Sequence, residues 1–471
     1  MINVLGLVAC ASSSPEPESA TQNTLQTQPE QTSPEINADI LNDSNTTPTE
    51  INHADTNIPN AAQPDIEQIA ESPIHDAQSD SPPDQPSTQT PDAVTSDHIV
   101  TSDIDTDPQS NSVSSENTIT EPVDYAAKRK TALAALRNGD TNDATDFWNA
   151  IDSDPLMTAT LYDEVKPRGT NALSALGGGS TVSLKYTDSN DETLKAAIKP
   201  DQDLRQTMYR SEIAYYRLCQ ILECSYDVPV TRPVKFSHDD FYQLYAASNS
   251  KKNKNYRSKF EHLIWEKEYG SKFIYAAHKE WIASFEFFPI EVTGEWSPYL
   301  KNPNTNPPEI DKFIRNLLAS ARPDAPKSSK KLLQFLEGKT TRDILHQISD
   351  MILIDYLTNN WDRFSGSVNN YGANCHIQPG GLIAIDNGAA FPPWHAPRVV
   401  RRLHMVETFS RTLVTNLRLI NVDELLIRLF PNPTHEERKS FDRFRERHAD
   451  ALKYIDKLIA KKGEENVLVF D

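Results

Sequence analysis

Two aspartates in the last third of the chain have neighbours that suit acid–base and metal chemistry. Asp362 lies in "LTNNWDRF", and Asp386 lies 24 residues later in "LIAIDNGAAF". Phosphoryl transfer needs one carboxylate beside the attacking hydroxyl. It needs a second one, with an amide, to hold the metal ion that neutralises the phosphates. The two segments therefore predict a pair of carboxylates with different roles.

The same stretch contains the elements that would position both aspartates. Residues 340–357 predict a helix with Thr340 or Thr341 as its N-cap and an apolar face at helical spacing. After it, "NCHIQ" and "LIAID" flank Pro379-Gly380-Gly381 and predict a β-hairpin. The hairpin would bring Asp386 to the end of a strand, directly before Asn387-Gly388.

A lysine and a glutamate earlier in the chain form a second candidate pair. "STVSLKY" and "TLKAAIK" alternate as strands, and residues 207–223 read as a helix. Glu212 shares one stripe of that helix with Met208, Tyr215, Cys219 and Leu222. An isolated Glu would favour the stripe edge and water, because burying an unpaired carboxylate costs several kcal/mol. Lys199, at the end of the preceding strand, offers a partner.

A strand lysine paired with a glutamate on the next helix is how protein kinases hold ATP phosphates. Here Gly177, Gly178 and Gly179 precede both residues. The glycine triplet is either a cover for phosphates or a plain turn, and the sequence does not decide between them.

Four motifs occur in kinase order, namely "AAIKPD", "RSEIAYYRLCQIL", "DYLTNNWDR" and "LIAIDNGAAF". Through them the chain resembles the atypical secretory-pathway kinases, the Golgi casein kinase family and its relative four-jointed. A looser likeness extends to HipA-like and phosphoinositide kinases. The resemblance implies an α+β, bilobal kinase-like fold, with a small β-rich N-lobe and a helical C-lobe.

The resemblance also implies roles for single residues. Lys199 would bind ATP phosphates and Glu212 would pair with it. Asp362 would be the catalytic base, and Asp386 would bind Mg²⁺ or Mn²⁺. These roles imply ATP and a divalent metal as cofactors.

The chain departs from the family pattern after Asp362-Arg363. Golgi kinases have histidine there, whereas this chain has Phe364-Ser365-Gly366. A metal-binding Asn is expected about five residues after the Asp, where Ser367 stands. We predict that Asn370, which precedes Tyr371, takes this role in preference to Asn369.

The cysteines give no disulfide framework like that of the eukaryotic enzymes. Cys219 and Cys224 are close enough in sequence to bridge at a helix end, or they are buried thiols like Cys375. We favour the thiols.

Composition separates the first quarter of the chain from the rest. No Lys or Arg precedes Lys128, and 22 of the 67 acidic residues lie before it, which leaves 45 against 47 basic residues. With so few large apolar residues, 11–122 cannot bury enough surface to offset its chain entropy, so we expect it to be disordered. No basic patch favours a nucleic-acid partner.

The first ten residues, "MINVLGLVAC", are apolar and end in a tetrapeptide that resembles a bacterial lipobox. It implies a lipoprotein signal over 1–10, a lipid anchor on Cys10 and a place in the cell envelope, periplasmic or surface-exposed. A secretory signal should have a basic start and a longer apolar region, so the true start could lie upstream. The alternative is a random apolar N-terminus. No apolar run of 18 residues occurs elsewhere.

We expect N-terminal helices and an N-lobe over 123–290 and a C-lobe over 291–471. "KEWIASFEFFPIEV", 279–292, reads as a buried aromatic strand where a hinge would contact adenine, and for Phe285 and Phe287 we favour a plain core role. The basic loop 249–259 is either a solvated insertion or an attraction for an acidic substrate.

Two functions follow. The first is a kinase-like phosphotransferase that moves the ATP γ-phosphate to a protein Ser/Thr or sugar hydroxyl at the cell surface. The alternative is a catalytically inactive kinase-fold binding protein. The intact Lys, Glu, Asp and Asp set favours the first. The unusual loop 364–370, and the scarcity of ATP outside the bacterial cytoplasm, favour the second.

Overall fold

The computed structural model describes most of the chain from Asp124 to the last residue. The described ranges are 124–138, 143–158, 162–176, 181–188, 195–204, 207–248, 250–251, 253, 256–321, 328–363 and 375–471. The predictions for 1–10 with Cys10, for 11–122, for Gly177 to Gly179 and for Asn369 and Asn370 lie outside these residues.

The helices of the described residues are α1 (Tyr125–Arg137), α2 (Asp143–Ser153), α3 (Pro155–Thr158), α4 (Tyr209–Leu222), α5 (His238–Ala246), α6 (Thr293–Lys301), α7 (Ile310–Ser320), α8 (Ser329–Phe335), α9 (Thr341–Thr358), α10 (Pro397–Leu403), α11 (Arg411–Leu419), α12 (Val422–Leu429) and α13 (His435–Lys462). The strands are β1 (Asp163–Glu164), β2 (Ala172–Ala175), β3 (Leu184–Thr187), β4 (Lys195–Pro200), β5 (Thr231–Ser237), β6 (Glu266–Glu268), β7 (Ser271–Glu280), β8 (Glu286–Phe287), β9 (Cys375–Gln378), β10 (Gly381–Ala384), β11 (Phe409–Ser410) and β12 (Leu468–Phe470).

A sheet forms the smaller lobe. Within the described residues it has seven strands in the order β1-β5-β7-β4-β3-β2, with β6 beside β7, and only the β1–β5 pair is parallel. On one face Ile198 and Phe236 pack against Phe241 of α5. On the other face Tyr275 packs with Ile213 of α4. Because side chains alternate along a strand and Ile198 faces α5, Lys199 points to the α4 face.

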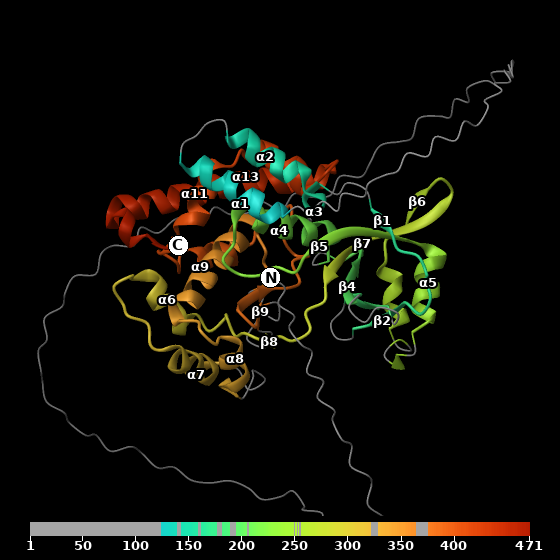
Figure 1. Cartoon of the computed structure of the whole chain (residues 1–471), viewed down its shortest axis with the longest axis horizontal. Helices are drawn as coiled ribbons and strands as arrows, with labels where there is room; N and C mark the ends of the chain where they lie inside the picture. Colours follow the sequence, from blue (N-terminus) through green and yellow to red (C-terminus); the bar gives the residue numbers. More distant parts are fainter. Residues whose placement is uncertain are drawn as a thin grey trace, which may run out of the picture. The chain divides into compact units, whose positions relative to one another are not determined.

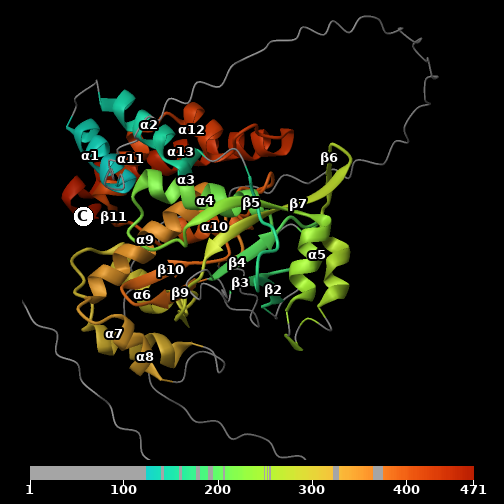
Figure 2. The ribbon, with the colours of Figure 1, turned by 45° about the vertical axis from the view of Figure 1, so that its right-hand side comes forward.

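Helices α6 to α13 form the larger lobe around α9, whose inward residues Ile344, Ile348 and Met351 are buried. Thr340 caps α9 and exchanges hydrogen bonds with Asp343, a capping box that fixes where the helix starts. The first three helices also belong to this lobe, because Leu133, Ile151 and Met157 are part of its core. Both views show α1 and α2 beside α11 and α13 (Figures 1 and 2). No described helix is long and apolar enough to cross a membrane.

The predicted hairpin is present, with β9 and β10 paired antiparallel and Gly381 opposite Gln378. Gly380 in its turn takes φ 103°, a conformation that residues with a side chain rarely adopt. β8 completes a three-stranded sheet beside β9. The hairpin places Asp386 two residues beyond the end of β10.

The prediction of one buried aromatic strand over 279–292 is wrong. β7 ends at Glu280, and β8 pairs with β9 in the other lobe's sheet, so the backbone between them crosses from one lobe to the other. Aromatic residues suit a strand, but they do not indicate which sheet the strand will join. The core role favoured for Phe285 is also wrong, because this residue is 40% exposed.

The cysteine prediction is wrong for one pair. Cys219 and Cys224 form a disulfide with their Cα atoms 5.1 Å apart, and only Cys375 is a buried thiol among the described residues. Glu223, the C-cap of α4, has φ 55°, and this left-handed turn carries Cys224 back over the last helical turn. The bridge therefore follows from the way α4 ends.

The carboxyl of Asp201, directly after β4, should make the stability of the fold depend on pH. Burial raises the pKa of its carboxyl to about 7, against the hydrogen bond of 3.1 Å that it accepts from the Gln202 N–H. A folded-state pKa above the unfolded value means that the ionised carboxyl destabilises the fold, and this cost grows as pH rises from about 4 to about 7.

Asp201→Asn should therefore raise the free energy of unfolding by about 1–2 kcal/mol at pH 8, after allowance for partial exposure, and by much less at pH 4. Urea denaturation of both chains at the two pH values measures this. An equal effect at pH 4 and pH 8 would contradict the pKa assignment.

Candidate active site

A cleft of about 350 Å³ lies between the two lobes. This volume falls within the range of about 300–1,000 Å³ that is usual for small-molecule sites. Its lining includes two chemically different groups of residues. The charged group contains Lys199, Lys279 and Asp386, and the apolar group contains Trp281, Ile282 and Phe285.

Lys199 is at the centre of the charged group. Its Nζ is 3.1 Å from Glu212 Oε1, and it also pairs with Asp386. Lys199 and Glu212 are 6% and 1% exposed, so both charges are almost out of water. Burial lowers the pKa of Lys199, but the attraction of Asp386 and Glu212 outweighs it and raises that pKa above the ordinary value. The structure thus brings three of the predicted site residues together, while their roles stay predictions.

Lys279 is a site residue that the sequence analysis missed. Its Nζ is 2.6 Å from Glu212 Oε2, which also accepts the Asn387 N–H at 2.9 Å. Burial raises the pKa of Glu212, but Lys279 and then Lys199 outweigh it and lower that pKa to about 2. The sequence did contain a signal for Lys279. It follows Tyr275 and Ala277 at a spacing of two residues, so it lies on the same face of β7 as these two buried residues.

Arg363 joins the segment of Asp362 to the segment of Asp386. It is fully buried and donates to the Ile385 carbonyl at 3.3 Å and to the side chain of Asn387, the two residues that flank Asp386. Asp386 itself has φ 63°, which Asp tolerates better than most residues. The segments that carry Asp362 and Asp386 are therefore connected through Arg363.

A second missed residue, Asp355 of α9, anchors this unit. Arg363 Nε donates to Asp355 Oδ2 at 2.8 Å, and the Tyr215 hydroxyl of α4 donates to Asp355 Oδ1 at 2.9 Å. Asp355 is 2% exposed in its side chain. A carboxylate inside the apolar run "ILIDYL" was the signal, since a buried charge needs a partner.

The remaining predicted residues are placed as follows. Asp362 is half-buried beside Arg363 and does not belong to the described lining of the cleft. Phe285 lines the cleft, and Phe287 packs edge-on against His376. In the described part of the chain, no three His, Cys, Asp or Glu side chains form a group that could hold a metal ion.

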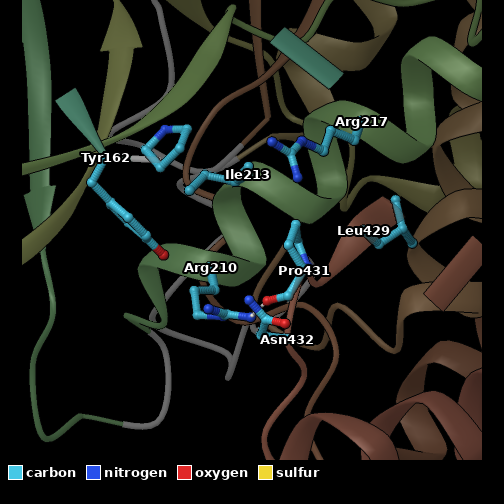
Figure 3. Close-up of a pocket in the computed structure, with 8 residues that line it drawn as sticks. Tyr162, Arg210, Ile213, Arg217, Leu429, Pro431 and Asn432 are labelled. Carbon is cyan, nitrogen blue, oxygen red and sulfur yellow. Dashed lines mark hydrogen bonds between the residues drawn. The ribbon is translucent and has the colours of Figure 1, made fainter. Parts of the chain in front are cut away.

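A smaller cavity of about 90 Å³ lies on the opposite side of α4, where Figure 3 shows Arg210 and Arg217 on one face of the helix. Those two positions are about half a helical turn around from Glu212. Arg210 pairs with Glu437 and donates to the Pro431 carbonyl at 2.8 Å. These contacts fasten the outer face of α4 to the larger lobe, so α4 is held on both sides.

The arrangement defines a class of fold. A strand lysine, a helix glutamate and a strand-end aspartate meet in a cleft between a sheet lobe and a helical lobe, as in kinase-like proteins. The chain is an α+β, bilobal protein of this class.

No protein-family model matches the chain, and no curated protein matches it significantly. Its fold is similar to the crystal structure of the Golgi casein kinase, with TM-score 0.39, 13% identity, 64% of this chain and 77% of that chain covered. It is also similar to the Helicobacter pylori proinflammatory kinase CtkA, with TM-score 0.31, 11% identity and coverage of 64% and 99%. Likeness at these levels supports no conclusion about activity or substrate.

Proposed function

We propose that the protein is an ATP- and metal-dependent kinase that moves the γ-phosphate of ATP to a protein Ser/Thr or sugar hydroxyl. One observation carries the proposal, namely the buried Lys199–Glu212 ion pair with the half-buried Asp386 beside it, in a cleft that is also lined by apolar residues. Burying charged side chains costs free energy, and a neutral ligand would not need them. The charges therefore favour a charged ligand such as a nucleotide.

The residues of the cleft fit a nucleoside triphosphate with a divalent cation. Trp281, Ile282 and Phe285 offer an apolar surface for the base, and the Lys185 ammonium lies 4.5 Å from the centre of the Trp281 ring. Lys199 offers a buried positive charge to the phosphates. When bound, the metal ion would neutralise phosphate charge, and we assign its binding to the Asp386 carboxylate.

Asp362 is assigned to the acceptor hydroxyl. Its carboxylate would take the hydroxyl proton as the acceptor oxygen bonds to the γ-phosphorus and the bond to the bridging β–γ oxygen breaks, which releases ADP. Arg363 fixes the backbone on which Asp362 stands through Asp355 and Asn387. This division gives each aspartate one task.

We extend the proposal to location, with Cys10 as the lipid anchor of an envelope protein. The support is the tetrapeptide Leu7-Val8-Ala9-Cys10 and the long polar segment after it. Labelling with an alkyne fatty acid in a bacterial host should mark the wild-type chain and leave Cys10→Ser unmarked. Equal labelling of both chains would reject the anchor.

Transfer of the labelled γ-phosphate from ATP tests the activity. With Mg²⁺ or Mn²⁺, the wild-type chain should transfer the label to itself or to a protein or glycan mixture, or it should hydrolyse ATP. Lys199→Met should show none of these activities. Lys235→Met is the matched control, because Lys235 lies in the same sheet but pairs with Glu268, outside the cleft. Metal-dependent ATP binding with no transfer would leave the inactive binding protein as the function.

A further inference from the structure

Lys279 and Lys199 occupy the same face of the small-lobe sheet. In the antiparallel register of β4 and β7, Lys279 is opposite Ala197 and Lys199 is opposite Ala277. Directly opposed residues point to the same face, so the two lysines are diagonal neighbours. Both are at least 94% buried, and both line the cleft.

Glu212 lies between them and gives one carboxylate oxygen to each. Oε1 is 3.1 Å from Lys199 Nζ, and Oε2 is 2.6 Å from Lys279 Nζ. Asp386 is the second anion of the cluster and pairs with Lys199. Lys199 thus has two anionic partners, Glu212 and Asp386, whereas Lys279 pairs with Glu212.

A nucleotide in the cleft would change this balance. The phosphates would share the Lys199 ammonium with Glu212, so Lys199 alone would neutralise less of the Glu212 charge. The Glu212 side chain is only 1% exposed, so keeping its carboxylate charged without a partner would cost much free energy. With one lysine, the phosphates and Glu212 would compete for the same ammonium group.

We propose that Lys279 is a positioning residue that keeps Glu212 charged and α4 docked while Lys199 serves the nucleotide. This inference rests on the proposed function, because it assumes a triphosphate in the cleft. The two-sided attachment of α4 agrees with it, since Arg210 holds the outer face of α4 through Glu437. The active arrangement is then complete before the nucleotide arrives.

The test compares ATP affinity in two backgrounds, by titration of the full-length chain with Mg²⁺ present. Lys279→Met should lower affinity about tenfold in the wild-type background, and Lys279→Arg should stay within about threefold of wild type. In the Glu212→Gln background, the side chain at position 212 has no charge that needs a partner. Lys279→Met should there change ATP affinity by less than about twofold. An equal loss in both backgrounds would mean that Lys279 contacts the nucleotide directly, and would overturn the positioning role.

Thermal unfolding without nucleotide separates this inference from the proposed function. Lys279→Met should lower the melting temperature by about 5 °C or more in the wild-type background and by much less with Glu212→Gln. If Lys279→Met alone does not fold, recovery of the folded chain by added Glu212→Gln is the expected result, and failure to recover counts against the ion pair.

The two failures are then distinguishable. If the melting temperatures are coupled but the wild type binds no ATP with any metal, the proposed function fails and the ion pair stands. If the wild type binds ATP and Lys279→Met binds it equally well, the positioning role fails alone.

Discussion

Asp362→Asn is expected to lower the turnover of phosphate transfer by ~10²-fold or more and to leave ATP affinity within about threefold of wild type. The reason is that a general base acts in the transition state, whereas in the proposed site the nucleotide would be held by Lys199 and Asp386, on the other side of the Arg363 contacts. Steady-state rates of transfer or ATP hydrolysis, with ATP titrations on the same samples, measure the two quantities separately.

Asp442→Asn is the matched control for Asp362→Asn, because Asp442 is an exposed aspartate on α13 that pairs with Arg445. It should keep full turnover. Full activity in Asp362→Asn would end the catalytic assignment of this residue. A parallel loss of ATP affinity and turnover would instead give Asp362 a structural or binding role.

Arg363→Met is expected to lower the free energy of unfolding by about 3–5 kcal/mol, the usual cost of removing one partner from a buried ion pair. The change leaves the Asp355 carboxylate without its guanidinium, and it removes the donors to Ile385 and Asn387. Denaturant unfolding of the full chain measures the loss. Because Asp355 would then be a buried charge, Asp355→Asn should recover part of the stability of Arg363→Met.

Arg445→Met provides the comparison for Arg363→Met. Arg445 also pairs with aspartates, but its side chain is 46% exposed, so its removal should cost at most about 1 kcal/mol. If Arg363→Met cost no more than Arg445→Met, the tie between the two aspartate segments would be structurally unimportant.

The parts of the fold that local signals determine could be predicted from the sequence. Thr340 and Asp343 mark the start of α9, and Pro379-Gly380-Gly381 marks the turn of the hairpin. These signals act between residues a few positions apart. The crossing of the chain between the lobes after Glu280 has no such signal, because it depends on the pairing of β8 with a strand about 90 residues later.

The candidate site divides in the same way. The approach of Lys199 and Glu212 could be inferred, because a strand end leads into the helix whose buried stripe carries the carboxylate. The second partner, Lys279, comes from a strand 67 residues after Glu212, and its identity depends on the register of β7 against β4. Asp355 was missed for a different reason: its partner Arg363 follows only eight residues later, but it lies beyond the end of α9, outside the spacing at which residues of one helix pair.

The most direct test of the account is titration of the full-length chain with ATP in Mg²⁺, in Mn²⁺ and after chelation, for the wild type and for Asp386→Ala. We predict that the wild type binds ATP and that either metal strengthens binding. Asp386→Ala should lose the metal-dependent part and keep the rest, because Asp386 is the carboxylate that faces the cleft beside Lys199. A wild-type chain that binds no ATP with any metal would contradict the account.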